Sequence, residues 1–537
     1  MKTLFVLICI LFYGASLFAL SWGFEGVVNS PDEAANLFFA DQFAQDGSFA
    51  VAQPLYERSF GLLHPRSMVT FAGSLLPGSF LGLPVLAGSL QAIFGDGAQF
   101  LLTPILLILA LLAWRGTVYH LFGNARLANL AVFFLAIHPG FWYYGMRSMM
   151  HNAAFVALLL IALWFLVAKP LQTHIHWRDI DPIVGGGLIG LALFFRGSEI
   201  LWVLGALVAA LIVLFMQKRV TWRVITSIAI GLFLGLIPSL FFNTTTYGDP
   251  FTTGYTATES VFEVTSAAAV TAGAEVESRS LVASILFPFG FHERVLLRNT
   301  WRYIFALYPW ISFFSIIGFF WWVADKKERK KKEWRLFTAL ALGVSAWLIL
   351  MYGSWVVHDN PDPNAVTLAN SYVRYWLPIF VFGSVFAAYA IEKFWADKSW
   401  YRSLVISCIL LFSLGLSVNL IWFGIDGVLD TRQALQSYEE KRAEVLSLTE
   451  DNAIIVVDYA DKYIFPHRDV VVPLRSETTY SHLPALREIA PLYYYGLTLP
   501  EEDLLYLQEE KLSSYGLMIE PVQEIMNETL YRIEFPR

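Results

Sequence analysis

Long apolar runs separated by short polar stretches dominate the chain. A helix needs roughly 20 apolar residues to cross about 30 Å of hydrocarbon, because its backbone polar groups must be satisfied within the segment. Eleven segments approach this length, and they are 3–21, 100–119, 128–145, 150–168, 183–197, 199–216, 224–242, 301–323, 336–355, 376–391 and 402–423. The pattern predicts an α-helical polytopic membrane protein with about eleven transmembrane helices.

The first segment has a second interpretation. Lys2, a short apolar run and the small residues after it also fit a cleaved signal peptide. In both cases the following chain emerges on the outer side of the membrane.

Basic residues set the orientation of the predicted helices, since Lys and Arg gather in cytoplasmic loops. The strongest such run is Lys326–Arg335. Weaker ones agree with it, and they are Lys218, Arg219 and Arg223, the segment 169–178, and the segment 393–402. We therefore expect residues 22–99, 243–300, 356–375 and everything after 424 on the outer side.

Ser79–Phe94 is also apolar, but it is short and contains Gly82, Pro84 and Gly88. If it crossed the membrane, every later basic loop would lie on the wrong side. We predict a helix that lies at the interface or dips into the outer leaflet.

Composition separates the last part of the chain from the rest. Of the 537 residues, 56% are hydrophobic and 15% charged, against roughly 25% charged in soluble proteins. From residue 424 onward, 21 acidic and 10 basic residues give a net charge of −11, although the whole chain carries −7. Strand-like runs at 453–458, 470–473, 515–520 and 530–535 alternate with helical patterns at 429–448 and 501–512. We predict a membrane module over 1–423 and a small acidic α/β domain over 424–537.

An acidic pair, Asp32 and Glu33, follows the first apolar segment by about ten residues. Partial desolvation at the lipid surface raises a carboxylate pKa, which would make Asp32 a better general base. The alternative is structural. Ser30, Pro31 and two acids before an apolar stretch are typical of a helix start, where acids complement the helix dipole.

Cationic and polar side chains recur at predicted outer turns. Glu57, His64 and Arg66 lie further along the first loop, and Pro65 stiffens the two cations that could face a phosphate. Arg66 could equally extend to lipid head groups. Arg147, His151, Asn152 and Arg374 are each either site residues or residues that satisfy a turn or anchor at the interface. Arg196 and Glu199 interrupt one long apolar run, so we expect a tight outer turn there, because charges at the membrane centre are costly.

These features together resemble the GT-C-fold glycosyltransferases, particularly glycosyltransferase family 39, with the protein O-mannosyltransferases and the aminoarabinose transferases. The resemblance covers about residues 1–423. It rests on Asp32-Glu33, on the Arg196-Gly-Ser-Glu199 break, on Tyr247-Gly-Asp-Pro-Phe-Thr-Thr-Gly-Tyr255, and on the large first and fourth outer loops. One departure is visible, because many relatives carry an acidic residue near the start of the fourth helix, where this chain has His151-Asn152.

The resemblance implies an inverting sugar transfer from a polyprenyl-phosphate donor to a protein, lipid or glycan acceptor at the outer face of the inner or plasma membrane. It implies Asp32 as base and Glu33 as a supporting residue. Phosphate ligands would be His64, Arg66, Arg196 and Arg374, and further site residues Glu57, Arg147, His151, Asn152 and Glu199. Such relatives often act without a metal or other cofactor, although scattered carboxylates could hold a divalent ion.

Two other functional classes stay open. One is a lipid or sugar transporter or flippase, although the predicted helices lack paired, interrupted segments in two matching halves. The other is a non-catalytic envelope scaffold. The acidic tail could bind the acceptor, with Asp458–Tyr463 as its candidate segment, or serve only as a solvated cap. No nucleic-acid partner is expected.

Overall fold

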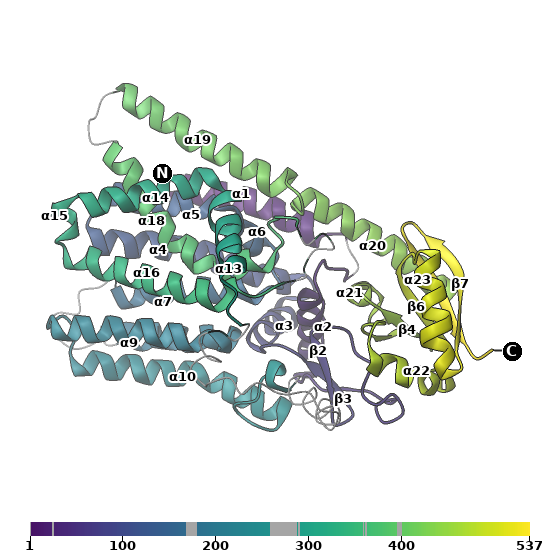
Figure 1. Cartoon of the computed structure of the whole chain (residues 1–537). Helices are drawn as coiled ribbons and strands as arrows, with labels where there is room; N and C mark the ends of the chain where they lie inside the picture. The colour runs from purple at the N-terminus through teal and green to yellow at the C-terminus, as the bar shows by residue number, and fades with distance from the viewer. Residues whose placement is uncertain are drawn as a thin grey trace. The chain divides into compact units, whose positions relative to one another are not determined.

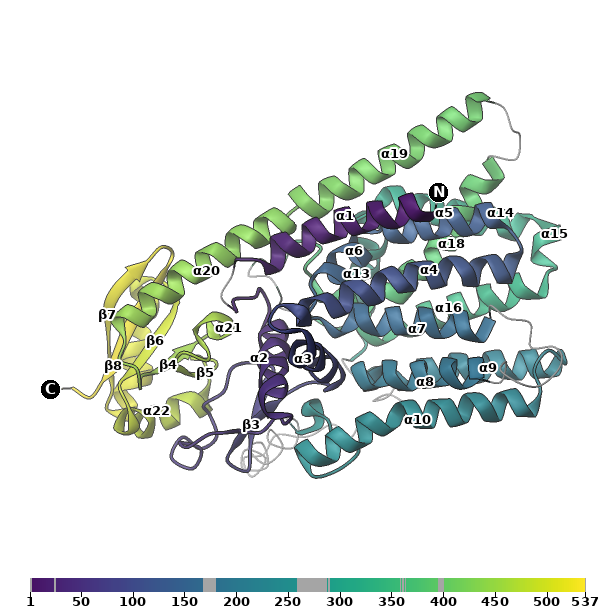
Figure 2. The ribbon, with the colours of Figure 1, turned by 180° about the vertical axis from the view of Figure 1, so that it is seen from behind.

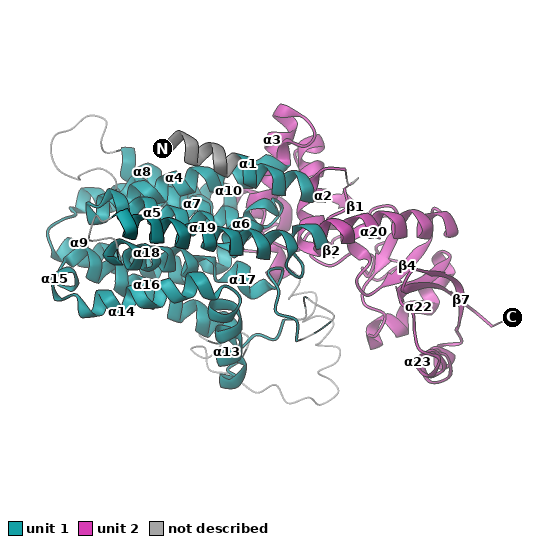
Figure 3. Ribbon diagram, turned by 90° about the horizontal axis from the view of Figure 1, so that it is seen from above, with its two compact units in different colours: residues 1–20, 100–240, 273–430 teal, residues 21–99, 241–272, 431–537 magenta. Residues whose placement is uncertain are grey.

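The computed structural model describes residues 2–23, 26–167, 180–257, 287, 290–357, 359, 362, 364–394 and 400–536. The basic segment 169–178 and most of the fourth outer loop, 258–286, lie outside the described residues. The chain forms two compact units, each discontinuous in sequence (Figure 3). Unit 1 comprises 1–20, 100–240 and 273–430, and unit 2 comprises 21–99, 241–272 and 431–537. By this division the first outer loop groups with the tail, whereas the sequence suggested one boundary near residue 424.

Unit 1 consists of helices, most of them apolar (Figure 1). They are α1 Lys2–Ser21, α4 Leu102–Phe122, α5 Ala125–Ala136, α6 Pro139–Met146, α7 His151–Val167, α8 Ile180–Phe195, α9 Ile200–Met216, most of α10 Trp222–Tyr247, α13 Glu293–Thr300, α14 Pro309–Ala324, α15 Lys326–Arg329, α16 Lys332–Gly353, α17 Ser371–Tyr375, α18 Leu377–Phe394 and α19 Trp400–Phe423. Every predicted apolar segment coincides with one of these helices or with a bent pair. The predicted helical membrane fold is confirmed.

Six described helices are long and apolar enough to cross a membrane, or up to eight if each bent pair is one span. In one bent pair, α5 and α6 are bent by 58° relative to each other. In the other, the helix Glu293–Ala306, which contains α13, and α14 are bent by 98°. The remaining three predicted spans correspond to shorter apolar helices, which are Leu11–Ser21, His151–Val167 and Ile180–Phe195. The number eleven therefore stays a prediction.

Glycines allow two of these helices to touch backbone to backbone. Gly187 and Gly190 of α8 face Gly231 and Gly235 of α10, while Gly186 lies against the Ile228 carbonyl. A Cβ on Gly231 would lie only 2.0 Å from the carbonyl oxygen of Ile183. Both helices thus carry glycines four residues apart, the small-residue spacing that permits close packing in lipid. Figure 2 shows α10 running along α8.

The first outer loop, in unit 2, contains helices α2 Pro31–Asp46 and α3 Gly82–Phe94. Between them lies a small antiparallel sheet of β1 Val51–Ala52, β2 Met68–Phe71 and β3 Ser74–Pro77, in the order β1-β3-β2. The helix expected at Ser79–Phe94 is therefore present and begins at Gly82. The sheet was not predicted, since its strands are only two to four residues long.

The tail of unit 2 contains a five-stranded sheet in the order β5-β4-β6-β8-β7. β4 Ile454–Val457, β5 Asp469–Val471 and β6 Leu492–Leu497 are parallel, while β8 Glu528–Glu534 and β7 Met518–Ile525 are antiparallel. All four predicted strands are confirmed, with small shifts. Strand β6 and helix α22 Glu477–Ile489 were missed.

Apolar side chains from helices cover both faces of this sheet. Leu435 and Val445 of α20, Val428–Leu448, pack with Ile455 and Val457 on one face. The other face is covered by α22 and by α23, Glu501–Tyr506, with the helical turn that follows it. Leu483 and Leu486 of α22 and Leu507 of that turn pack with Ile454 and Val456 of β4. The predicted small C-terminal α/β domain is confirmed.

Candidate functional site

Asp32 lies in the first turn of α2, with Glu33 beside it. The Ser30 hydroxyl caps this helix by accepting a hydrogen bond from the Asp32 amide at 3.3 Å. The helix-start interpretation of the acidic pair is therefore correct, and the helix dipole stabilises both negative charges. Glu33 is only 5% exposed, whereas Asp32 is half-buried. Asp32 is thus the member of the pair that solvent or a substrate reaches more readily.

A hydroxyl group orients the Asp32 side chain. The Ser67 Oγ donates a hydrogen bond to Asp32 Oδ1 at 2.7 Å. Ser67 has a positive φ of 62°, a left-handed conformation that is uncommon outside glycine. Such backbone strain persists only where the surroundings enforce it. The surrounding contacts therefore enforce the left-handed backbone conformation of Ser67.

The enforcing contacts come from Gly78 at the end of the β2–β3 hairpin. The Gly78 amide donates to the Ser67 carbonyl at 3.0 Å. A Cβ on Gly78 would lie 2.8 Å from the Ser67 carbonyl carbon, so only glycine fits at this approach.

The segment Tyr247–Tyr255 packs on the same hairpin within unit 2. The Tyr247 hydroxyl donates to the Pro77 carbonyl at 2.7 Å, and the Gly254 amide donates to the Ser79 carbonyl at 3.3 Å. A Cβ on Gly254 would lie 2.2 Å from the Ser79 nitrogen. This segment, which carried part of the family resemblance, therefore fixes the hairpin end that holds Ser67 against Asp32.

Arg66, predicted as a phosphate ligand, forms an ion pair inside unit 2. Its guanidinium contacts Asp461 at 2.5 Å, and its backbone amide donates to the same carboxylate at 2.9 Å. Asp461 is fully buried, while the Arg66 side chain is 33% exposed. The arginine thus compensates a buried charge. A phosphate role for Arg66 stays a prediction, and it would compete with this pair.

The rest of the Asp458–Tyr463 segment is also engaged in internal contacts. Asp458 accepts hydrogen bonds from the Leu474 amide and the Tyr494 hydroxyl, at 3.1 and 2.9 Å. Lys462 donates to the Asn29 carbonyl at 3.0 Å. These contacts give the segment a structural function in unit 2, and acceptor binding by this segment stays a prediction.

His64 is half-buried, and its desolvation lowers its pKa below the usual 6.5. Its Nδ1 donates to the Pro65 carbonyl at 3.0 Å. The imidazole is therefore neutral at pH 7, unlike the cation that the sequence suggested. Glu57 lies exposed in the same loop.

We expect His64→Asn to leave the pH profile of activity unchanged between pH 6 and 8, because a neutral side chain replaces a neutral one. Its stability should change at acid pH. The depressed pKa means that the unfolded state binds the proton more tightly, so wild type loses stability as the pH falls below about 6.5, and the variant should lose less. Thermal unfolding at pH 5 and 7.5 measures this. If His64→Asn raises the KM for the donor severalfold, the result would instead support a role of His64 in phosphate binding.

Unit 1 contains a second set of the predicted residues, which we call the arginine cluster: Arg147, Arg196 and Arg374. Arg147 caps the end of α6 and lies over the Tyr143 and Tyr144 rings. Arg196 and Arg374 lie over the Tyr375 ring, at 5.0 and 5.3 Å from its centroid. Their positive charges are thus gathered on aromatic faces, which favour cations.

Backbone and sulfur contacts connect the cluster further. Arg374 donates to the Ser371 hydroxyl at 2.9 Å and contacts the Met150 sulfur at 3.0 Å. The Met150 amide donates to the Arg147 carbonyl at 3.2 Å. His151 and Asn152, in the first turn of α7 directly after Met150, are both buried. The structure therefore gathers these predicted residues at one end of the unit 1 helices.

The break at Arg196–Glu199 is confirmed. Helix α8 ends at Phe195, a 3₁₀ turn spans Gly197–Glu199, and α9 begins at Ile200. Arg196 Nη2 contacts Glu199 at 2.7 Å, and both side chains are less than a tenth exposed. Glu199 also accepts from the Tyr352 hydroxyl at 2.6 Å and from the Trp202 indole at 2.5 Å. Glu199 is therefore an orienting partner of Arg196.

The structure does not describe any group of three or more His, Cys, Asp or Glu side chains that could hold a metal ion. The expectation of activity without a metal stays a prediction.

Solved structures that resemble the chain include two of one transferase and one of an oligosaccharyltransferase. ArnT from Cupriavidus metallidurans bound to undecaprenyl phosphate has 10% sequence identity and a TM-score of 0.51, covering 99% of this chain and 97% of that one. The same ArnT in the apo state has 11% sequence identity and a TM-score of 0.49, and the match covers 99% of this chain and 98% of that one. The Archaeoglobus fulgidus oligosaccharyltransferase in complex with Zn and sulfate has 13% sequence identity and a TM-score of 0.40, and the match covers 87% of this chain and 68% of that one.

The chain has the ArnT fold. This likeness confirms the predicted GT-C-like architecture, and at 10% identity it concerns the fold alone. No family model matches the sequence, and no curated protein matches it. Membership in glycosyltransferase family 39 or among the mannosyltransferases therefore stays a prediction.

On this ArnT fold, several residues that shape the two sets of candidates were missed from the sequence. They are Ser67, Tyr352, Tyr375 and Asp359, whose carboxylate accepts from the Ser371 amide at 2.6 Å. Tyr375 directly follows Arg374, so an arginine-tyrosine pair before an apolar segment was a visible signal. Ser67 carried none, because its partner lies 35 residues away.

Proposed function

We propose that the protein is a membrane glycosyltransferase that moves a sugar from a polyprenyl-phosphate donor to an acceptor hydroxyl. The observation that carries the proposal is the fold shared with ArnT over 99% of the chain, because that ArnT structure binds undecaprenyl phosphate. Sugar transfer of this kind needs a base for the acceptor proton and cations for the departing phosphate. Asp32 and the arginine cluster are the side chains suited to these two tasks.

In the proposed reaction, the acceptor oxygen attacks the anomeric carbon as its proton passes to Asp32. The bond from the anomeric carbon to the phosphate oxygen breaks on the opposite side, so the configuration inverts. The released lipid phosphate gains the electron pair of that bond. Asp32 returns its proton to water after the product leaves. We assign no covalent intermediate, because one base and phosphate stabilisation suffice.

Several residues around these two sets have supporting tasks. Ser67 orients the Asp32 carboxylate, and Glu33 stabilises the start of α2 beside it. In unit 1, Glu199 and Tyr352 hold Arg196, while Tyr375 places its ring under two of the arginines. We propose the outer face of the membrane as the side of the reaction, on the distribution of basic residues in the sequence.

We expect Arg374→Gln to weaken the binding of undecaprenyl phosphate by about tenfold or more, since a hydrogen bond to a charged group contributes about 1.5–3 kcal/mol. Native mass spectrometry of the protein in nanodiscs measures this, with undecaprenol as the uncharged lipid control. Arg223→Gln is the matched control, because Arg223 is an exposed arginine in a predicted cytoplasmic loop.

Equal affinity of wild type for undecaprenyl phosphate and undecaprenol would contradict the phosphate role of the arginine cluster. In that case, if the protein is instead a lipid or sugar transporter, its ligand is something other than this lipid phosphate. Preferential binding of the phosphate that Arg374→Gln abolishes, while Arg223→Gln retains it, would support the proposal.

A further inference from the structure

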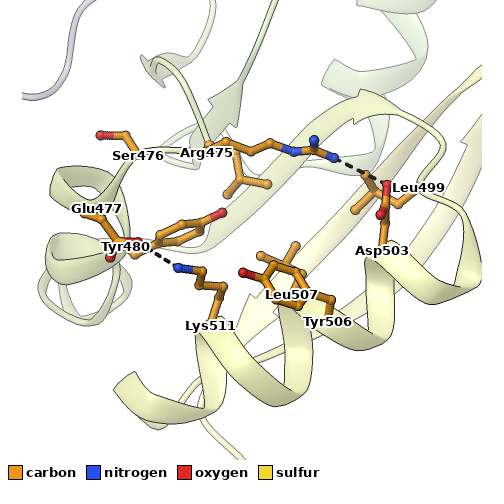
Figure 4. A pocket seen from close by; sticks show the side chains of 10 residues that line it. Arg475, Ser476, Glu477, Tyr480, Leu499, Asp503, Tyr506, Leu507 and Lys511 are labelled. Carbon is orange, nitrogen blue, oxygen red and sulfur yellow. Dashed lines mark hydrogen bonds and ion pairs between the residues drawn. The ribbon is translucent and has the colours of Figure 1, made fainter.

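The C-terminal domain contains a pocket far along the chain from Asp32 and the arginine cluster. Its volume is about 340 Å³, and ten residues line it (Figure 4). One wall consists of Leu474–Glu477 and Tyr480, at the start of α22, and the other of residues on α23 and the π-helical turn Leu507–Leu512 that continues it. Small-molecule sites in proteins begin at about 300 Å³, so the pocket has room for a small ligand.

Two ion pairs join these walls. Arg475 contacts Asp503 at 3.5 Å, and Lys511 contacts Glu477 at 2.7 Å (Figure 4). All four side chains are between 30% and 74% exposed. Exposed ion pairs of this kind contribute little to stability, so their donors and acceptors can turn to a ligand at small cost.

Aromatic and apolar groups form the rest of the lining. Tyr480 and Tyr506 come from opposite walls, and Leu474, Leu499 and Leu507 add apolar surface. The Lys511 ammonium lies 5.8 Å from the Tyr480 ring centroid. The pocket thus combines aromatic rings with paired donors and acceptors, and its two cations balance its two carboxylates.

This combination fits a neutral pyranose. The apolar C–H face of a sugar ring packs on an aromatic side chain, while its adjacent hydroxyl groups both donate and accept hydrogen bonds. A phosphate or a uronate would face the carboxylates of Asp503 and Glu477, which repel it. An apolar ligand would displace water from the four charged side chains without offering them hydrogen bonds of its own, which is costly.

The local backbone adds an independent observation. Residues Leu507–Leu512 form a π-helical turn, and this turn carries the lining residues Leu507 and Lys511. π-Helical turns are rare, and they occur frequently at functional sites. The turn places Lys511 opposite Glu477 and thereby closes one end of the pocket (Figure 4).

We propose that this pocket binds a neutral pyranose unit of a glycan. The ligand would stack on Tyr506 or Tyr480 and exchange hydrogen bonds with the two ion pairs. This inference goes beyond the proposed transferase activity and does not depend on it, since none of the lining residues belongs to the Asp32 site or the arginine cluster.

The test uses the full-length protein in detergent and saturation-transfer NMR with a panel of methyl pyranosides and short neutral oligosaccharides. Methyl glucuronide and inorganic phosphate are the anionic probes. Glu477→Gln should weaken sugar binding about tenfold, because it removes a charged acceptor. Tyr506→Ala should weaken it severalfold through the lost ring contact.

Two matched variants control for folding and surface effects. Glu509→Gln changes an exposed carboxylate of the same π-helical turn that does not line the pocket, and Leu505→Ala shortens a side chain that is 49% exposed, as Tyr506 is. Both should bind sugar as wild type does.

Sugar binding that is lost in the two pocket variants and kept in the two controls would support the proposal. Lack of binding by wild type across the neutral panel would overturn it, as would equal binding in all variants or a preference for glucuronide or phosphate. Undecaprenyl phosphate binding, measured on the same preparation, shows separately whether the transferase proposal fails.

Discussion

Asp32→Asn is expected to lower sugar transfer by about 10²- to 10⁴-fold, the usual contribution of a general base. Asparagine keeps the carbonyl oxygen that can accept the Ser67 hydrogen bond, and it remains compatible with the first turn of α2. The variant should therefore stay folded and still bind the donor. Turnover of a radiolabelled polyprenyl-phosphate sugar, beside the thermal unfolding midpoint, measures both properties.

Asp46→Asn is the matched control for this substitution. It makes the same chemical change on the same helix, at the exposed last residue of α2, and should leave turnover unchanged. Ser67→Ala should give an intermediate loss, since it removes the group that orients the carboxylate and leaves the carboxylate itself. Full activity of Asp32→Asn would exclude Asp32 as the base and transfer that role to another carboxylate.

Arg66→Ala is expected to destabilise unit 2 by about 3–5 kcal/mol, because it leaves the buried Asp461 carboxylate without its counter-charge. Hydrogen exchange of the β4 and β5 amides measures the change locally, which suits a protein with two units better than one global midpoint. Arg58→Ala is the control, an exposed arginine of the same loop, and it should change exchange little.

The double variant Arg66→Met with Asp461→Asn separates charge from packing. It removes both charges and keeps an oxygen that can accept from the residue 66 amide. We expect it to recover most of the lost protection. If the β4 and β5 amides of Arg66→Ala exchange as fast as those of wild type, the ion pair has no structural function. Arg66 of the wild-type protein would then again be a candidate phosphate ligand.

Hydrophobic patterning alone located the helices of unit 1, because lipid requires long, uninterrupted apolar segments. The same requirement exposed the break at Arg196–Glu199, since charges do not fit inside a span. Helix bends were invisible, because a helix–helix corner such as that between α5 and α6 keeps the apolar run intact.

Long-range contacts explain what the sequence did not reveal in unit 2. Arg66 looked like a phosphate ligand because its partner Asp461 lies 395 residues away. His64 looked like a cation because burial, which lowers its pKa, is a property of the fold. Strand β6 was overlooked although Tyr493, Tyr494 and Tyr495 have high strand propensity.

The most direct test of the proposed activity is the release of lipid phosphate from a panel of polyprenyl-phosphate sugars by the purified wild-type protein in nanodiscs. We expect release from at least one donor, with a product of inverted anomeric configuration when an acceptor is present. Absence of release and transfer across the panel, in a preparation that also binds undecaprenyl phosphate no better than undecaprenol, would contradict the glycosyltransferase proposal.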